Sequence, residues 1–275
     1  MSQVSRYQGA LRHIYAYWPR YALLYAGLIT AVLLIGISAN QGWMGLLLLS
    51  VALLITLCYA LAGALWAVHQ LYDAAGLQPH QLLFDMGQIR ETDRLAFIDL
   101  DKRPQALALG RRLTSGQVTV IDVYNPQLTP GQGLARSRAR LPQPLLNDPR
   151  FVWRNGRIDL LPLPNESVSA VILYEVLSQY WQVGDQEMLL REVRRVLTPN
   201  GRLLIAERTR TRNNILLMGP AGLSLAPLTH WRELLHRAGF VIRREQNLSG
   251  LIHCLRADKP VAAQAQQLQL PWGDG

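Results

Sequence analysis

Cysteine and lysine are both scarce in this chain. Cysteine occurs only at Cys58 and Cys254, in unrelated contexts, which excludes a disulfide framework and a cysteine-based metal site and predicts two buried, small apolar residues. Lysine occurs only at Lys102 and Lys259, so the net charge of +9 comes almost wholly from arginine. A diffuse positive charge suits nucleic acid or an anionic bilayer. Because no nucleic-acid motif is present, we expect a lipid bilayer, and no nucleic acid, as partner.

Charge is absent from Tyr21 to Val68, and charged residues make up only 17% of the chain. One membrane span needs about 20 apolar residues. The run therefore predicts two spans, 21–39 and 43–68, separated by "SANQGW" at 38–43 and forming an antiparallel transmembrane hairpin. A cleaved signal peptide fits poorly, since the apolar stretch is too long and contains a turn. A buried hairpin of a soluble protein would have no solvated face.

The charges that flank the apolar run predict its orientation. Arg6, Arg12 and Arg20 precede the first span, and the connecting loop has no charge. The positive-inside rule then places both termini and the rest of the chain in the cytoplasm, at a bacterial-type inner (cytoplasmic) membrane. Residues 1–20 form a basic cytoplasmic N-terminus. Five arginines further along could contact the same anionic leaflet or form a solvated helix face: Arg136, Arg138, Arg140, Arg150 and Arg154.

Beyond the hairpin, a linker helix at 69–93 precedes alternating strand and helix patterns over 94–259. Apolar or β-branched runs predict strands at 95–100, 117–123, 151–153, 169–174, 202–207 and in the two final segments "FVIRREQ" and "LIHCLRA". Helical patterns lie at 105–113, from Gly133, at 186–197 and at 231–238, the last capped by Thr229. This alternation predicts an α/β fold, a doubly wound, mostly parallel sheet with an antiparallel final hairpin. Residues 260–275 are predicted to be disordered.

Three segments carry a family resemblance: "LPLPNESVSAVILYEVLSQY", "LLREVRRVLTPNGRLLIAE" and "HWRELLHRAGF". In this order and spacing they resemble the class I S-adenosylmethionine (SAM)-dependent methyltransferases, in the subgroup of small-molecule and quinone methyltransferases. The resemblance covers about Asp93 to Lys259. It implies a seven-stranded Rossmann-like sheet, SAM as cofactor, no metal, and a site outside the carboxyl ends of the central strands.

The resemblance assigns cofactor-binding residues unevenly. The turn after the first strand, "DLDKRPQ", would hold SAM through Asp99, Asp101 and Lys102, but it lacks the family's glycines. Lys102 and Arg103 could clamp the cofactor's carboxylate. The turn could instead bind another anion at the helix start, or be a solvated loop. A glycine turn at "FDMGQ", with Asp85 and Gly87, is a further alternative.

Asp122 ends the second strand and would bind the ribose hydroxyls, or would only cap the turn before Asn125-Pro126. Ile158 and Leu173 complete the cofactor-binding residues that the resemblance implies.

Two residues at the end of the fourth strand are the catalytic candidates. Tyr174 and Glu175 stand where the family places groups near the transferred methyl, and Glu175 is the acid available as a general base there. Glu175 could instead face solvent. Ser178 occupies a position where relatives often carry histidine. The uncharged segment 213–228 could cover an apolar substrate or be an ordinary packed connection.

Two functions remain open from the sequence. The first is a membrane-anchored SAM-dependent methyltransferase acting on a lipophilic acceptor such as a quinone, an isoprenoid or a lipid. The second is a non-catalytic methyltransferase-fold protein that serves as a membrane-tethered binding or assembly module, with a lipophilic small molecule or a membrane protein as partner. The fold alone does not choose between them.

Overall fold

The computed structural model describes residues 8–72, 78–141 and 148–260. Its centre is a seven-stranded sheet. The strands are β1 (Arg94–Asp99), β2 (Gln117–Asp122), β3 (Phe151–Asn155), β4 (Val168–Tyr174), β5 (Leu197–Glu207), β6 (Val241–Leu248) and β7 (Ile252–Asp258).

Their spatial order is β3-β2-β1-β4-β5-β7-β6. β1 to β5 pair in parallel, and β7 runs antiparallel to both β5 and β6. The sequence prediction of a mostly parallel sheet with an antiparallel final hairpin is therefore confirmed.

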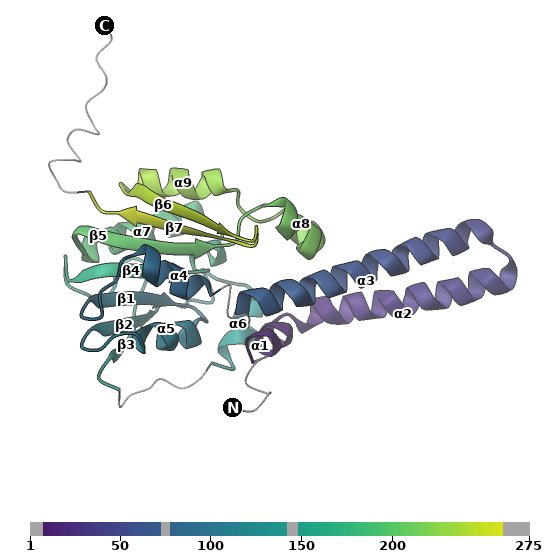
Figure 1. Cartoon of the computed structure of the whole chain (residues 1–275), viewed down its shortest axis with the longest axis horizontal. Coiled ribbons are helices and arrows are strands. Elements are labelled where there is room, and N and C mark those ends of the chain that lie inside the picture. The colour runs from purple at the N-terminus through teal and green to yellow at the C-terminus, as the bar shows by residue number, and fades with distance from the viewer. Residues whose placement is uncertain (1–7, 73–77, 142–147, 261–275) are drawn as a thin grey trace, which may run out of the picture.

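Helices cover both faces of the sheet (Figure 1). They are α4 (Pro79–Met86), α5 (Arg103–Gly110), α6 (Gln132–Arg138), α7 (Val183–Val196) and α9 (Leu228–Arg237). The chain also has helix α8 (Arg212–Met218) and the short 3-10 helices η2 (Leu177–Gln179) and η3 (Gly219–Gly222). One hydrophobic core packs Leu189 and Trp231, from α7 and α9, against one face, and the other packs Phe84 and Leu109, from α4 and α5, against the opposite face. Two cores on one sheet are what a doubly wound fold requires.

The apolar region forms the predicted helical hairpin. Helix α1 (Gln8–Ala16) leads into α2 (Trp18–Gln41), which is joined by a tight turn to α3 (Met44–Tyr72). The turn is at Gly42, in the left-handed region with φ 70°, and the Trp43 amide donates to the Ser38 carbonyl at 2.9 Å. Glycine ends a helix in this way because it has no Cβ to clash.

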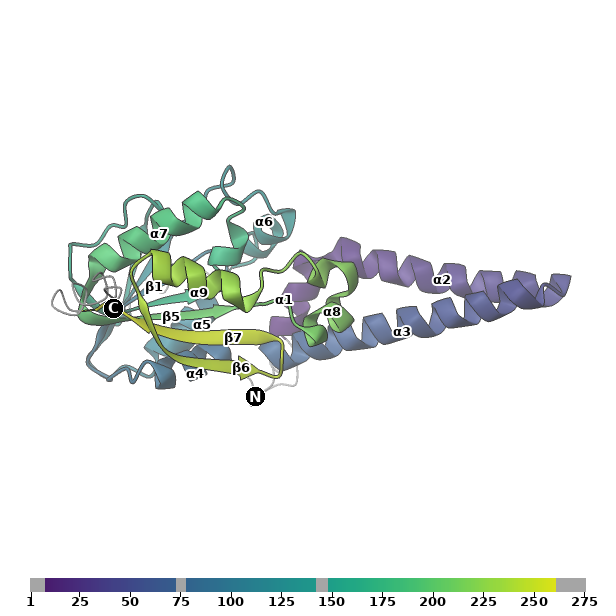
Figure 2. The same cartoon turned by 90° about the horizontal axis from the view of Figure 1, so that it is seen from above.

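The two long helices project away from the sheet (Figures 1 and 2). Only 11% of the apolar window of α2 and 6% of that of α3 is buried, so neither is the core helix of a soluble protein. Thr30, Ser38, Ser50 and Thr56 donate their hydroxyls to carbonyls four residues back in the same helix, which satisfies them without water. Both helices are long and apolar enough to be candidate membrane spans.

Several local predictions need correction. The strand predicted at 202–207 begins earlier, because β5 starts at Leu197, directly after α7 ends at Val196. Pro227, not Thr229, caps α9. Cys254 is buried as expected, but Cys58 is exposed on the outer surface of α3. In the predicted linker, α3 extends to Tyr72 and α4 begins at Pro79, while 73–77 and 261–275, including nearly all of the predicted tail, lie outside the described residues.

The base of the hairpin docks on the domain through α1 and α6. Arg136 Nε donates to the Ala16 carbonyl at 2.8 Å. The Tyr17 ring lies against Gly133 so closely that a Cβ on Gly133 would be 2.3 Å from the ring carbon Cε1. Figure 2 shows α8 beside the start of the hairpin, in contact with α3. The hairpin therefore has a defined position against the sheet.

Replacing Gly133 with alanine should loosen this docking. The new methyl group overlaps the Tyr17 ring, and overpacking of this kind costs about 1–3 kcal/mol, more than the gain in helix propensity. We expect hydrogen exchange of α1 amides in the detergent-solubilised chain to rise about tenfold, with β1 and β4 unchanged. The matched control is Gly131→Ala, because nothing lies within 4 Å of a Cβ at Gly131. Equal exchange in both variants would contradict the docking contact.

Candidate functional site

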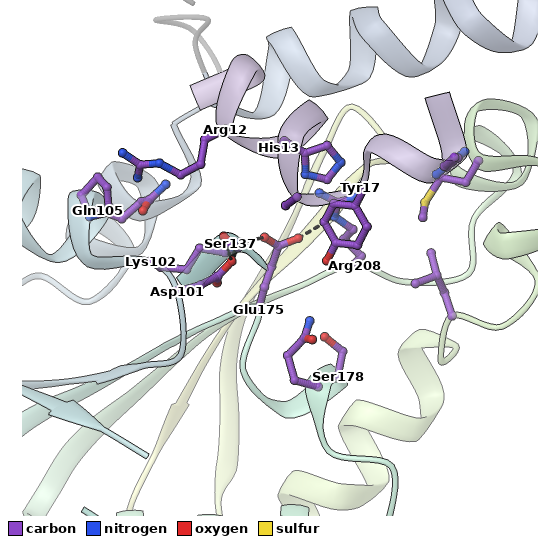
Figure 3. Close-up of a pocket in the computed structure, with 16 residues that line it drawn as sticks. Arg12, His13, Tyr17, Asp101, Lys102, Gln105, Ser137, Glu175, Ser178 and Arg208 are labelled. Atoms are coloured by element: carbon purple, nitrogen blue, oxygen red, sulfur yellow. Dashed lines mark hydrogen bonds and ion pairs between the residues drawn. The ribbon is translucent and has the colours of Figure 1, made fainter. Parts of the chain in front are cut away.

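A pocket lies where the carboxyl ends of β1, β4 and β5 meet the base of the hairpin (Figure 3). Its volume is about 410 Å³. The sheet contributes the turn after β1, the residue after β4 and the residue after β5, and the roof comes from α1 and the first turn of α2. The polar side chains around it are Arg12, His13, Tyr17, Arg20, Asp101, Lys102, Gln105, Ser137, Glu175, Ser178, Gln179 and Arg208.

Glu175 occupies the centre of the floor. It follows β4 with φ 50°, and its amide donates to the Ala206 carbonyl at 2.8 Å, which holds this backbone conformation. Its carboxylate pairs with Lys102 Nζ at 2.9 Å and with Arg208 Nε at 2.5 Å. The alternative that Glu175 faces solvent is wrong, because the residue is buried. Tyr174 is buried in the core beneath, with Lys102 Nζ 5.9 Å from its ring centre.

The cations around Glu175 control the titration of the pocket. Burial alone would raise the pKa of Glu175, but Arg208 and Lys102 outweigh burial and hold that pKa below its usual range. Burial lowers the pKa of His13, above the floor, to about 3, and Arg208 and Lys102 add to that shift. At neutral pH the floor is therefore a carboxylate between two cations, beneath a neutral imidazole.

The turn after β1 is held by its own acids. Asp99 is fully buried and accepts hydrogen bonds from the Lys102 amide at 2.7 Å and from Arg103 Nε at 3.1 Å. Asp101 accepts from the Ser137 hydroxyl at 2.8 Å and pairs with Lys102 Nζ at 3.2 Å. Burial, helped by nearby Asp122, raises the pKa of Asp99 to about 6. The turn is thus a packed, cross-linked segment, and the alternative of a solvated loop is wrong.

Asp122 is the residue expected to bind ribose, and its carboxylate is already occupied. Oδ1 accepts from the Tyr124 amide at 3.1 Å, as in the turn-capping alternative. Oδ2 accepts from Arg103 Nη2 at 3.1 Å and from Arg138 Nη2 at 2.6 Å. Arg138 also donates to the Leu100 carbonyl and lies 4.1 Å from the Tyr124 ring centre. One guanidinium therefore fills the space between the ends of β1 and β2.

These residues do not fit an adenosyl group of SAM. The binding site expected for the adenosyl group is lined by glycine, and the acidic residue that binds the ribose is free. Here the turn has no glycine, Pro104 has no amide hydrogen, and Arg138 covers Asp122. Ile158 and Leu173, also expected at the cofactor, lie in the hydrophobic core. Of the predicted site residues, the structure brings Asp101, Lys102 and Glu175 together in the pocket. Asp99 and Asp122 both bind Arg103 next to the turn, and Tyr174, Ile158 and Leu173 are buried in the core.

Several pocket residues were not anticipated from the sequence. Arg208 directly follows β5, so the rule that sites lie at carboxyl ends of strands would have found it. Arg138 was predicted to belong to a basic cluster of five arginines. The other four have separate partners: Arg136 binds Ala16, Arg140 lies over Tyr15, Arg150 pairs with Asp148, and Arg154 donates to Pro162. No sequence signal placed α1 over the site.

One further alternative is excluded by its position, and another stays open. The "FDMGQ" segment is not the cofactor turn, because it lies in and after α4 on the face of the sheet, where Asp85 pairs with Arg112 at 2.8 Å. The uncharged segment 213–228 does reach the site, since Met218 and Leu225 line the pocket. Its role as a substrate cover stays a prediction.

Glu207, at the end of β5, gives the site a testable pH dependence. It is fully buried and accepts from the Leu177 amide at 2.7 Å, and burial, with a contribution from Glu175, raises its pKa to about 7. The folded chain then binds this proton more tightly than the unfolded chain, in which the pKa of this carboxyl is 4.5. The resulting stability is complete below pH 4.5 and is lost as the pH rises through about 7.

In the wild type, titration of Glu207 should lower the free energy of unfolding by at most about 3 kcal/mol between pH 5 and pH 7. The Glu207→Gln variant has no carboxyl to titrate, so this loss should disappear. Thermal melting of the detergent-solubilised chain across that range measures it. The matched control is Glu233→Gln, an exposed position on α9. Parallel melting curves for wild type and Glu207→Gln would contradict the raised pKa.

The comparisons with known proteins agree with the sheet order. A family model described as a methyltransferase domain matches residues 104–205, which begin in α5 and end within β5. A SAM-dependent methyltransferase from Aquifex aeolicus superposes with a TM-score of 0.51 at 15% identity, covering 66% of this chain and 89% of that one. No curated protein matches the sequence.

Other solved structures share the fold. The cyclase SpnF superposes with a TM-score of 0.52 at 20% identity, covering 70% of this chain and 83% of its own. The pyocyanin biosynthetic protein PhzM gives 0.52 at 16% identity, covering 72% and 58%. Such likenesses show the fold, not the chemistry. The chain therefore has the Rossmann-like fold of class I SAM-dependent methyltransferases, part of it matches a methyltransferase domain model, and two candidate membrane-spanning helices precede it.

Proposed function

We propose that this protein is a membrane-tethered, non-catalytic module built on a methyltransferase fold. The observation that carries the proposal is the binding of Asp122 by both Arg103 and Arg138. A ribose could reach that carboxylate only after Arg138 had left Asp122, the Leu100 carbonyl and the Tyr124 ring. Breaking charge-assisted hydrogen bonds of this kind costs about 1.5–3 kcal/mol each.

The charge around the site also opposes SAM. Its sulfonium is a cation, and it would lie among Lys102, Arg103 and Arg208, whose side chains surround the ends of β1 and β5. Like charges at short range in a partly buried site repel by several kcal/mol. Glu175 offers little compensation because Lys102 and Arg208 already neutralise it.

The hairpin would fix the module to a bilayer. Both apolar helices expose large side chains such as Leu23, Leu48 and Ile55, which favours lipid over water as their surroundings. The arginines before the first span favour a cytoplasmic location for the domain and both termini at a bacterial inner membrane. In that arrangement the carboxyl edge of the sheet faces the membrane.

One observation favours a second candidate, a methyltransferase acting on a lipophilic acceptor. The pocket opens beside Glu175, where the family places groups near the transferred methyl, and Met218 and Leu225 give it an apolar wall near the hairpin. A quinone, isoprenoid or lipid would suit such a wall. This function requires SAM to bind, so one titration separates the two candidates.

Calorimetric titration of the detergent-solubilised chain with SAM should show no binding up to about millimolar concentration, because Arg138 covers the ribose acid. A SAM-binding methyltransferase of the same fold, titrated in the same detergent, is the control. Micromolar binding that is lost in Asp122→Ala would refute the module and establish the methyltransferase.

Asp122→Ala should instead act on stability. It leaves the guanidinium groups of Arg103 and Arg138 without their shared carboxylate, which should lower the free energy of unfolding by about 2–3 kcal/mol. Denaturant unfolding followed by tryptophan fluorescence measures the change. The matched control is Asp159→Ala, since Asp159 also pairs with an arginine, Arg157, but on the surface. Similar small losses in both variants would argue against a structural role for Asp122.

A further inference from the structure

The pocket lies at the depth where a membrane span would leave the bilayer. Arg12 and His13 project from α1, and Tyr17 stands at its junction with α2. Arg20 also lines the pocket, although it belongs to the first turn of α2, whose candidate span begins at Trp18. Tryptophan and arginine at the end of a span mark the headgroup layer of a bilayer. The roof of the pocket would therefore lie among lipid headgroups.

The pocket has an excess of positive charge. Four permanent cations line it, Arg12, Arg20, Lys102 and Arg208, against the carboxylates of Asp101 and Glu175, an excess of two positive charges. The carboxylates are engaged within the floor, Glu175 with Lys102 and Arg208, and Asp101 with Lys102 and Ser137. The excess therefore lies on the roof side.

Arg12 is the clearest part of this excess. Its guanidinium makes no hydrogen bond or ion pair with the residues that the structure describes, and it points toward Gln105 in Figure 3. Among the described residues, Gln105 Oε1 is buried and has no hydrogen-bond partner. The low pKa of His13, caused by burial and then by Arg208 and Lys102, agrees with a positive potential in the pocket. A ligand with several anionic oxygens would accept hydrogen bonds from the Arg12 guanidinium, whereas Gln105 Oε1 is itself an acceptor and needs a donor.

One wall of the pocket is apolar and leads toward the hairpin. Met218 ends α8 and Leu225 follows η3. Helix α8 packs against α3, as Figure 2 shows, and Leu223 nearby is 57% exposed. A ligand with a charged head and an apolar tail fits this arrangement better than a compact anion, because the tail can follow the wall into the bilayer.

We propose that this pocket binds the phosphate headgroup of an anionic lipid, with the phosphate at Arg12 and Arg20 and the apolar chain passing Met218 and Leu225 toward α3. The proposal rests on the module function, because the methionine part of SAM would compete for the Asp101–Lys102 side of the same pocket. Different experiments test the proposed function and this site: titration with SAM tests the non-catalytic module, and titration with lipid tests the headgroup site.

The experiment titrates the full chain, in a non-ionic detergent, with three probes while tryptophan fluorescence is recorded. The probes are short-chain phosphatidic acid, short-chain diacylglycerol without the phosphate, and water-soluble glycerol phosphate without the chains. Phosphatidic acid should bind about tenfold or more tightly than either of the others, because only it offers both the phosphate and the apolar chain. A free phosphate ligand would instead make glycerol phosphate bind as tightly as the lipid.

Arginine variants locate the site. Arg12→Gln/Arg20→Gln should weaken phosphatidic acid binding about tenfold or more, since each loses a charge-assisted hydrogen bond to phosphate. The matched control is Arg111→Gln/Arg244→Gln, which removes the same charge from exposed positions on the domain. It should change affinity by less than about twofold. If the double pocket variant does not fold, Arg12→Gln alone serves, because Arg12 holds no other described residue.

Three results would overturn the proposal. Diacylglycerol binding as tightly as phosphatidic acid would show that the phosphate is not recognised, and equal affinity for glycerol phosphate would assign the site to a soluble anion. Equal weakening in the pocket and control variants would show diffuse attraction to the chain's net charge of +9 rather than a site.

Discussion

The carboxylate of Asp122, shared by two guanidinium groups, is the contact on which the site depends. Arg103 comes from the start of α5 and also binds Asp99, and Arg138 comes from α6 and also binds the Leu100 carbonyl. The cluster thereby ties the ends of β1 and β2 to two helices. Removing one member leaves its partners partly buried and unpaired, which costs more than the pair itself contributes. Such a cluster of charged side chains stabilises its own arrangement, because each group would lose a partner if another group moved away.

The second constraint is the docking of the hairpin. Two helices that pack on each other in lipid need no further contact. Even so, α1 covers the carboxyl edge of the sheet, where the Tyr17 ring packs on Gly133 and Arg136 donates to the Ala16 carbonyl. Class I folds place ligands at this edge. In the proposed membrane arrangement, with α1 as its roof, the edge would be accessible mainly from the side of the bilayer. The hairpin would then both fix the location of the domain and limit which molecules reach Glu175.

The strands were predictable because their signal is local. Each central strand is an apolar run buried on both faces, as in "LAFID" and "VILY", and the carboxyl-end rule then located Lys102, Asp122 and Glu175. The arginine network was not predictable, because Arg138 meets Asp122 and Leu100 only through tertiary folding. A short basic helix has the same sequence pattern whether it pairs with a buried acid or with lipid. Ile158 and Leu173 lie in the hydrophobic core, and their predicted contact with a cofactor stays a prediction.

The persistence of the fold beside an altered site has a physical basis. The two hydrophobic cores use residues on the faces of the sheet, whereas the site uses residues beyond the strand ends, so the glycine turn can be lost at little cost to packing. Side chains at the edge, not the sheet, then decide the chemistry. Here the side chains of Lys102 and Arg208 flank the carboxylate of Glu175, and in the proposed function such a site would hold an anion rather than receive a sulfonium.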